Sequence, residues 1–160
     1  MGKEKNMNHN YYMKIALEEA KKAYKEREVP IGCVLVIDNK IIAKAHNMKE
    51  LTGQAIYHAE VLAIKKACEK IGLWRLEGSY LYTTVEPCVM CSGAIIHSRV
   101  ENVIYGTCDS KNGCHKSKID LLTSNLFNHK VNVISGIMKE ECEKILKDFF
   151  KEIREEKRKK

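Results

Sequence analysis

The sequence contains few of the residues that break secondary structure or form flexible linkers, with only two prolines and nine glycines among 160 residues. This composition leaves no room for a long flexible connection between domains. A chain of this length is close to the size of one typical domain and is long enough to bury a hydrophobic core. We therefore expect residues 1–160 to form a single domain.

No stretch of apolar residues approaches the length that a membrane-spanning helix requires, and residues 1–10 are polar without the apolar segment of a secretion signal. These absences argue against a membrane protein and predict a cytoplasmic one. The seven cysteines are an odd number. In an intracellular chain they indicate free thiols and metal ligands, not a disulfide framework.

Acidic residues are in the minority, and the formal net charge of +7 favours an anionic partner. Residues 151–160 hold six Lys or Arg residues against three Glu residues. A solvated helix end is the simplest interpretation of this basic run. Contact with nucleic acid through phosphate neutralisation is the more specific one.

Two short motifs carry the chemistry of the chain, His58-Ala59-Glu60 and Pro87-Cys88-Val89-Met90-Cys91. One imidazole and two thiolates are the ligand set of a zinc ion that keeps its fourth position open for water. Cys88 and Cys91 lie three residues apart, so a helix that begins near Pro87 presents both from one face of its first turn. The sequence therefore predicts a catalytic zinc site made by His58, Cys88 and Cys91.

Glu60 follows His58 by two residues, and in a helix two such side chains do not lie on the same face. We expect Glu60 to reach the zinc-bound water and to shuttle protons, because H-x-E followed by P-C-x-x-C is the signature of zinc-dependent nucleobase deaminases. Two plainer alternatives are a structural zinc site with a fourth ligand elsewhere and reduced cysteines in a core beside a surface histidine. The order, the spacing and the helix-starting proline favour the catalytic site.

Hydrophobic periodicity predicts alternating helices and strands. The predicted helices cover Tyr11–Glu26, His58 to Gly72, Cys88–His97 and the chain from Lys139 onward. The predicted strands are Ile31–Ile37, Ile41–Ala45, Tyr80–Val85, Asn102–Tyr105 and Val131–Ser135, the first two forming a hairpin. The polar loop from Thr107 to Lys118 contains Cys108, Cys114 and His115, but their irregular spacing does not predict a second metal site.

The succession of strand, helix and strand between Tyr80 and Tyr105 predicts a right-handed crossover between two parallel strands. The zinc ion would then lie between the N-termini of the helices that begin at His58 and Cys88. This position is just outside the carboxyl ends of the strands, where open α/β sheets usually hold their sites.

The chain resembles bacterial tRNA-specific adenosine deaminases over almost its whole length. The likeness rests on the two zinc motifs, on His97-Ser98-Arg99, on Asp148-Phe149-Phe150 and on Glu26-Arg27-Glu28-Val29-Pro30. It implies a three-layer α/β/α fold of the cytidine deaminase type with a five-stranded mixed sheet. It also implies a homodimer, one zinc ion per chain, and conversion of the wobble adenosine of a tRNA anticodon to inosine.

The same resemblance implies substrate contacts. Asn47 would hydrogen-bond the flipped base, and Asp109 would lie near a neighbouring sugar. Phe149 and the helix after it, including Arg154, would contact the anticodon stem-loop. The chain departs from the family at Gln54-Ala55-Ile56-Tyr57, just before His58, so the pocket wall and the choice of substrate are expected to reflect Ile56 and Tyr57.

The expected reaction is hydrolytic deamination by zinc-activated water, with Glu60 as the proton shuttle and C6 of adenine as the point of attack. One alternative uses the same zinc set on a free nucleoside, nucleotide or base, such as cytidine, deoxycytidylate or guanine. Another alternative is a non-catalytic zinc module that only binds RNA. Glu60 beside His58 argues against the second alternative.

Overall fold

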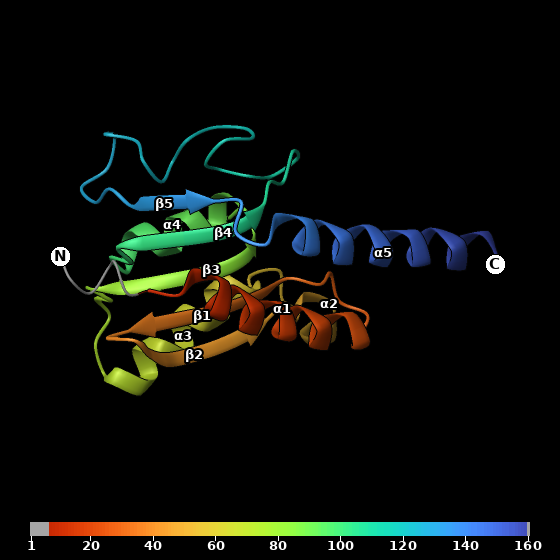
Figure 1. Ribbon diagram of the computed structural model, residues 1–160, viewed down its shortest axis with the longest axis horizontal. Coiled ribbons are helices and arrows are strands. Elements are labelled where there is room, and N and C mark those ends of the chain that lie inside the picture. Colours follow the sequence, from red (N-terminus) through yellow and green to blue (C-terminus); the bar gives the residue numbers. More distant parts are fainter. Residues whose placement is uncertain (1–6, 160) are drawn as a thin grey trace.

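The computed structural model describes residues 7–159, which contain five strands and five helices. The helices are α1 (His9–Lys25), α2 (Lys49–Thr52), α3 (Ala59–Ile71), α4 (Val89–His97) and α5 (Lys139–Arg158). The strands are β1 (Gly32–Ile37), β2 (Lys40–His46), β3 (Ser79–Val85), β4 (Asn102–Thr107) and β5 (Asn132–Ser135) (Figure 1). Every predicted element is present with its ends shifted by at most two residues, and the short helix α2 was not predicted.

The five strands form one mixed sheet in the order β2-β1-β3-β4-β5. β1 is antiparallel to both β2 and β3, while β3, β4 and β5 run parallel to one another. Asp38 and Asn39 join β1 to β2 with φ angles of 51° and 58°. A two-residue hairpin turn requires such positive angles, because its twist must match that of the strands. The predicted hairpin and the predicted parallel crossover are both confirmed.

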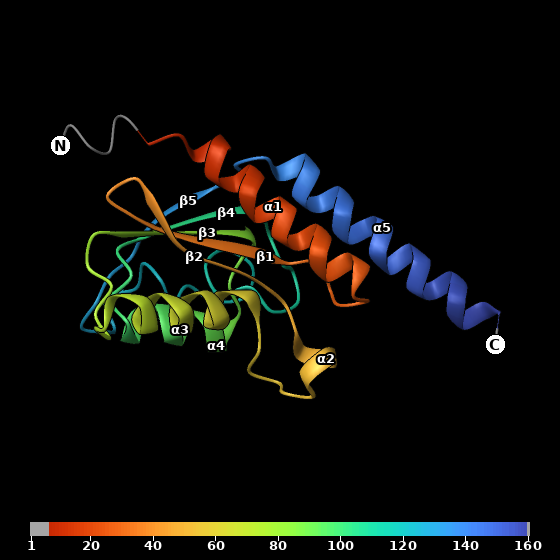
Figure 2. The same ribbon diagram turned by 90° about the horizontal axis from the view of Figure 1, so that it is seen from below.

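The sheet is covered on both faces, with α1 and α5 on one side and α3 and α4 on the other (Figure 2). Aliphatic side chains fill the space between the sheet and α3 with α4, among them Leu81 and Ile95. A second core between the sheet and α1 with α5 includes Met13 and Tyr82. Burial on both faces explains the nearly continuous apolar runs of the central strands. The three-layer α/β/α fold implied by the resemblance is therefore confirmed.

The ends of α1 and α3 follow local sequence signals. The side chain of Asn8 accepts a hydrogen bond from the backbone N–H of Tyr11 and so caps the start of α1. Gly72 ends α3 in the left-handed region at φ 73°, which glycine adopts without steric cost. α3 therefore begins directly after the predicted ligand His58 and ends directly before Gly72.

Strands β3 and β4 finish at the same end of the sheet, and α4 begins there. α5 starts near this end and extends beyond it, away from the sheet (Figure 1). Residues 108–131 connect β4 to β5 without a helix or strand, a longer connection than the predicted polar loop. Within residues 7–159, no helix combines the length and the apolar character needed to cross a bilayer.

Candidate active site

Three predicted metal ligands meet at the end of the sheet where β3 finishes. The ligand atoms of His58, Cys88 and Cys91 all lie within 4.8 Å of one another. His58 is the N-cap of α3, Cys88 is the N-cap of α4, and Cys91 lies in the first turn of α4. Both helices therefore direct the positive ends of their dipoles at the cluster, which favours thiolate over thiol.

The spacing of the three side chains fits a tetrahedral zinc ion. The Nδ1 atom of His58 lies 3.6 Å from the Sγ atom of Cys88 and 3.6 Å from the Sγ atom of Cys91. Bonds of about 2.3 Å to sulfur and about 2.0–2.1 Å to nitrogen at tetrahedral angles require a separation of about 3.6 Å between the nitrogen and each sulfur. Within residues 7–159, no fourth His, Cys, Asp or Glu joins the group. The group can therefore hold a metal ion with a coordination position left for water.

The two thiols share their protons unequally. The hydrogen bond with Cys91 lowers the pKa of Cys88 to about 4 against the opposing effect of burial, and His58 acts in the same direction. The hydrogen bond with Cys88, together with burial, raises the pKa of Cys91 well above its usual range. Cys88 is thus a thiolate at neutral pH, and a cation would favour loss of the second proton, because metal binding releases protons from its ligands.

Glu60 lies in the first turn of α3 beside this cluster and is only 3% exposed. Burial raises the pKa of its carboxyl group to about 7, and the charge of Cys88 acts in the same direction. Its Oε1 atom has no hydrogen-bond partner. A buried carboxyl group that can hold or release a proton near neutral pH has the property of a general acid or base.

Asn47 directly follows β2 and is buried. Its amide nitrogen donates to the backbone oxygen of Val29 at 3.4 Å, while its Oδ1 atom has no partner. The backbone N–H of Met48 donates to the carbonyl oxygen of Tyr57, which places the segment after Asn47 beside the residue before His58. Among residues 7–159, three buried side-chain polar atoms lack a partner, and two of them belong to Asn47 and Glu60.

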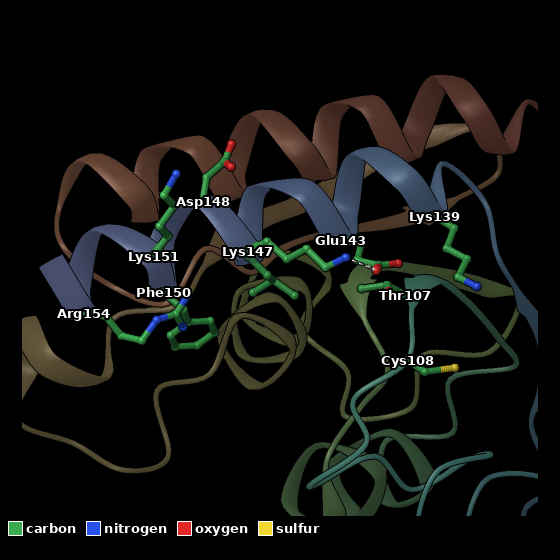
Figure 3. A pocket seen from close by; sticks show the side chains of 10 residues that line it. Thr107, Cys108, Lys139, Glu143, Lys147, Asp148, Phe150, Lys151 and Arg154 are labelled. Atoms are coloured by element: carbon green, nitrogen blue, oxygen red, sulfur yellow. Dashed lines mark ion pairs between the residues drawn. The ribbon is translucent and has the colours of Figure 1, made fainter.

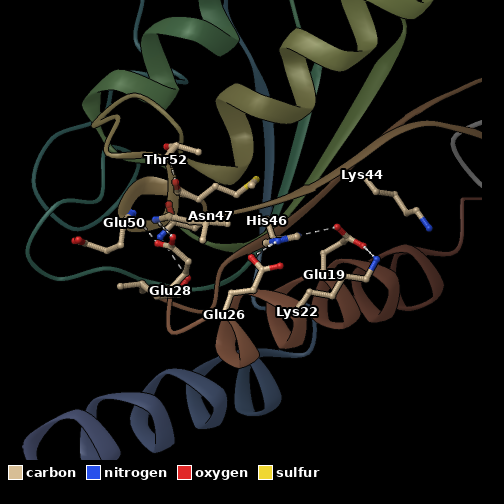
Figure 4. Close-up of polar contacts among 12 residues, drawn as sticks. Glu19, Lys22, Glu26, Glu28, Lys44, His46, Asn47, Glu50 and Thr52 are labelled. Atoms are coloured by element: carbon tan, nitrogen blue, oxygen red, sulfur yellow. Dashed lines mark hydrogen bonds and ion pairs between the residues drawn. The ribbon is translucent and has the colours of Figure 1, made fainter.

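The segment after Asn47 is held by a buried carboxylate. Glu28 is 0% exposed and accepts hydrogen bonds from the backbone N–H groups of Glu50 and Leu51 (Figure 4). These are donors of the first turn of α2, whose N-cap residue Met48 makes no side-chain cap. Glu28 therefore takes the role of the cap from more than 20 residues away in the sequence.

A second contact holds the residue before Asn47. The imidazole of His46 lies between two carboxylates, with Nδ1 3.3 Å from Glu19 and Nε2 3.0 Å from Glu26 (Figure 4). Both glutamates belong to α1 or to its C-terminal end, so the contact joins α1 to the end of β2. Hydrogen bonds thus hold the chain on both sides of Asn47, at His46 before it and at Glu50 and Leu51 after it.

Ile56 and Tyr57, the departure from the family pattern, directly precede the predicted metal ligand His58. Tyr57 is half-buried and packs against the core beneath α3. Ile56 is 54% exposed, and its carbonyl oxygen accepts a hydrogen bond from the backbone N–H of His58. The exposed member of the pair is therefore hydrogen-bonded through its backbone to a predicted metal ligand.

Asp109 lies in the loop after β4. Its backbone N–H donates to Glu86 at 3.1 Å, and its own carboxylate accepts from the backbone N–H groups of Lys111 and Asn112. Burial, followed by the charges of Cys88, Glu86 and Asp109, raises the pKa of Cys114. The backbone N–H of Cys114 donates to the carbonyl oxygen of Pro87 at 2.9 Å, so the loop that contains Asp109 packs against the residue before Cys88.

Glu86, the residue before Pro87, is itself buried and charged. Burial favours the neutral form of Glu86. The hydroxyl of Ser117 and the backbone N–H groups of residues 115–117 outweigh this effect and lower its pKa to about 2. The carboxylate is therefore ionised at neutral pH inside the protein.

Two neighbouring phenylalanines of α5 have different environments. Phe149 is only 4% exposed and packs edge-on against Tyr24, with the guanidinium of Arg27 5.8 Å above its ring. Its ring is therefore not available to stack on a base in this structure, contrary to the expected contact. Phe150 is 43% exposed and offers a ring at the surface instead.

An open groove of about 680 Å³ lies between α5 and the end of β4 (Figure 3). At one end it is lined by Thr107 and Cys108, directly before Asp109. Along α5 it is lined by Leu146, Phe150 and six charged residues. Four of these are basic, Lys139, Lys147, Lys151 and Arg154, and two are acidic, Glu143 and Asp148. Lys147 is paired with Glu143 at 2.7 Å. The expected contact residue Arg154 is thus part of a predominantly basic groove that leads toward the Asp109 loop, while Lys160 of the basic run lies outside the described residues.

The loop cysteines form no further metal site. Within the described part of the chain, the His58 cluster is the one group of three or more potential ligands. Cys114 is buried and Cys108 is exposed. The imidazole of His115 accepts or donates a hydrogen bond with the hydroxyl of Tyr105 at 2.8 Å.

The anchoring roles of Glu28 and Glu86 were not predicted. Both carboxylates are buried. In the sequence Glu28 precedes a valine and Glu86 precedes a proline, and neither neighbour indicates that the glutamate is buried. The groups that they bind are 22 to 31 residues away. The only sequence signal was a glutamate placed directly before an apolar or proline residue, which is too common to identify such a role.

Comparisons of the sequence with known proteins find deaminases. The sequence model of the MafB19-like deaminase family matches residues 7–154. A tRNA-specific adenosine deaminase from Bacillus subtilis (strain 168) is 52% identical over 147 residues, which cover 92% of this chain and 91% of that protein. A protein of the same name from Aquifex aeolicus (strain VF5) is 43% identical over 154 residues, covering 96% of this chain and 97% of that protein.

The fold gives the same result. One similar solved structure comes from biochemical and structural studies of A-to-I editing by tRNA:A34 deaminases at the wobble position of transfer RNA. It superposes with a TM-score of 0.82 at 39% identity, covering 85% of this chain and 99% of that one. Both the sequence over nearly its full length and the three-layer architecture with its His-Cys-Cys group thus lead to one conclusion. The chain belongs to the family of tRNA-specific adenosine deaminases.

Proposed function

We propose that this chain converts adenosine to inosine at the wobble position of a tRNA anticodon by hydrolytic deamination. The observation that carries the proposal is the environment of Glu60, whose buried carboxyl group lies beside a His-Cys-Cys group in a chain 52% identical to a tRNA-specific adenosine deaminase. The net reaction adds water at C6 of the base and releases ammonia. Both the donor set and the unpartnered polar atoms of Asn47 and Glu60 support this chemistry.

The metal ligands in the proposal are His58, Cys88 and Cys91, and the ion is zinc. When bound there, zinc supplies a water whose pKa is lowered from about 15.7 toward about 7. Glu60 would take a proton from the attacking water, pass it to the purine and then assist the departure of ammonia. Its raised pKa suits both steps, because a general acid–base group works best when its pKa is near the working pH.

Asn47 positions the base in the proposal. A purine that has left its stack exposes polar atoms on its edge, and a single-stranded anticodon loop permits this at low energetic cost. The Oδ1 atom of Asn47 is buried without a partner, so it can accept a hydrogen bond from the base. Asp109, on the loop that borders the metal ligands, would contact the neighbouring nucleotide.

The direct test of the function is inosine analysis. Zinc-loaded protein is incubated with an anticodon stem-loop that has adenosine at the wobble position, and the digested RNA is analysed for inosine by mass spectrometry. We expect one inosine per stem-loop with the unmodified protein and about 10²- to 10⁴-fold slower formation of inosine with the Glu60→Gln variant. A stem-loop with guanosine at the wobble position serves as the substrate control. Turnover of free cytidine, deoxycytidylate or guanine without turnover of the stem-loop would replace this function with that of a free-base or nucleoside deaminase.

The basic groove along α5 is the proposed path of the RNA backbone. Replacing Lys151 and Arg154 by glutamine removes two positive charges, so we expect weaker binding of the stem-loop and a salt dependence of log Kd that is less steep by roughly two. The rate at saturating RNA should change little, since neither side chain belongs to the metal site. Binding is measured at several salt concentrations.

The control for this prediction removes the same charge elsewhere. Lys40 begins β2 and Lys70 lies in the last turn of α3, at the end of the sheet opposite the metal ligands. Lys40→Gln with Lys70→Gln should leave the slope unchanged. Substitutions are preferable to truncation of α5, because Arg27 pairs with Glu152 and Glu156 of that helix. If both double variants and the unmodified protein had the same salt dependence of log Kd, the groove would not contact the RNA backbone.

Three further features are proposed from the composition of the chain and from the resemblance. Residues 1–160 form one zinc-dependent deaminase domain, the protein is a homodimer, and it acts in the cytoplasm, where its tRNA substrate is found. Sedimentation of the purified protein tests the homodimer.

A further inference from the structure

The buried carboxylate of Glu86 accepts five hydrogen bonds from the loop after β4. Its Oε2 atom accepts from the backbone N–H groups of His115, Lys116 and Ser117 at 2.9, 2.8 and 3.1 Å. Its Oε1 atom accepts from the backbone N–H of Asp109 at 3.1 Å and from the hydroxyl of Ser117. One buried side chain therefore holds both ends of the 109–117 loop.

The backbone of the 109–117 loop also packs closely against Glu86 and Pro87. A Cβ atom on Gly113 would lie 2.3 Å from the carboxyl group of Glu86, so a side chain at this position would have to displace that carboxyl group. The backbone N–H of Cys114 donates to the carbonyl oxygen of Pro87 at 2.9 Å. The loop thus docks on the two residues that immediately precede the metal ligand Cys88.

We propose that Glu86 is a positioning residue that holds the 109–117 loop so that Asp109 faces the RNA beside the metal site. This inference rests on the proposed function, which gives Asp109 its role as an RNA contact. Glu86 does not itself touch the substrate or the reacting atoms. It acts through the backbone of Asp109, and its effect should therefore fall on RNA recognition more than on the chemical step.

The substitution Glu86→Gln tests the role selectively. The amide oxygen of the introduced side chain can occupy the place of Oε2 and keep the three bonds to residues 115–117. The amide nitrogen then occupies the place of Oε1, where the hydroxyl of Ser117 can turn to accept a hydrogen bond. The backbone N–H of Asp109, however, meets a second donor and loses its partner. Glu86→Gln therefore releases Asp109 while most of the loop stays anchored.

The experiment compares Glu86→Gln, Asp109→Ala and the double variant as zinc-loaded full-length proteins. We expect Glu86→Gln to raise KM for the anticodon stem-loop by roughly tenfold, the effect of one hydrogen bond, while kcat and the zinc content stay close to those of the unmodified protein. Because Glu86 acts through Asp109, the double variant should have the KM of Asp109→Ala alone. Ser110→Ala, an exposed position in the same loop, is the control and should leave KM unchanged.

Amide hydrogen exchange supplies a readout that needs no substrate. In Glu86→Gln, exchange at the amide of Asp109 should accelerate, while exchange at the amides of β3 and α5 should not. If the unmodified protein fails to deaminate the stem-loop, the proposed function falls, but this measurement still tests the anchoring of Asp109. Should Glu86→Gln fail to fold, Ser117→Ala removes one donor from the Oε1 atom of Glu86 and should raise KM by a smaller factor.

Three results would overturn the proposal. The first is additive effects of Glu86→Gln and Asp109→Ala on KM, which would mean that the two residues act independently. The second is loss of zinc and kcat in Glu86→Gln without a change in KM, which would make Glu86 a support of the metal site alone. The third is unchanged exchange at the amide of Asp109.

Discussion

Replacing Glu60 by glutamine is expected to slow deamination of the anticodon stem-loop by about 10²- to 10⁴-fold, the usual contribution of general acid–base catalysis. Glutamine has nearly the shape of glutamate but cannot accept the proton of the attacking water. The variant should keep its zinc and its affinity for RNA, because Glu60 is not one of the three converging ligands. Single-turnover rates, elemental analysis and stem-loop binding measure the three quantities separately.

A glutamate on the same helix is the control for this variant. Glu69 is exposed on α3 and paired with Lys65, so Glu69→Gln removes the same charge from the same element without touching the cluster. Its rate should match that of the unmodified protein. Loss of zinc from Glu60→Gln in proportion to the loss of activity would instead make Glu60 a metal ligand, and the proposed proton transfer would have to be abandoned.

Replacing Cys88 or Cys91 by serine is expected to abolish zinc binding and activity together. Each substitution exchanges a thiolate, a strong zinc ligand, for a hydroxyl that remains protonated at neutral pH. Cys91 is buried whereas Cys88 is half-buried, so the hydroxyl of Cys91→Ser should cost more stability and lower Tm further. Zinc is measured by elemental analysis of the purified proteins and stability by thermal unfolding.

Cys108→Ser is the matched thiol control. Cys108 is exposed in the loop after β4 and does not belong to the ligand group. This variant should retain about one zinc ion per chain, the stoichiometry of a three-ligand catalytic site. If Cys88→Ser and Cys91→Ser kept their zinc, the metal would have to be bound elsewhere, and the assignment of the site would be wrong.

The structure divides the proposed RNA contacts into two groups. Asn47 and Asp109 lie on segments that buried carboxylates hold by their backbone, Glu28 for the first and Glu86 for the second. Phe150 and Arg154 line an open groove on a helix that extends past the sheet. We infer that the anchored segments position the reacting nucleotide, whereas the groove provides affinity that depends on salt.

The sequence by itself was sufficient for the features whose cause is local. The three-residue spacing of Cys88 and Cys91 places both at the start of one helix, and the pattern around Glu60 places it two positions after the predicted ligand His58. The apolar periods of the strands and helices determined the order of the ten elements except α2. These features follow from backbone geometry and side-chain pattern within a few residues.

Only the tertiary structure decided the features that depend on distant partners. α2 was missed because its cap is Glu28, which lies 22 residues before the first amide that it binds. The burial of Phe149 depends on Tyr24 and Arg27 at the end of α1, so the exposed ring proved to be Phe150. The role of Glu86 is visible only in the structure, where the 109–117 loop covers it and donates hydrogen bonds to its carboxylate. Burying a charge requires hydrogen-bond donors to compensate for lost water, and here those donors come from segments that the local sequence does not specify.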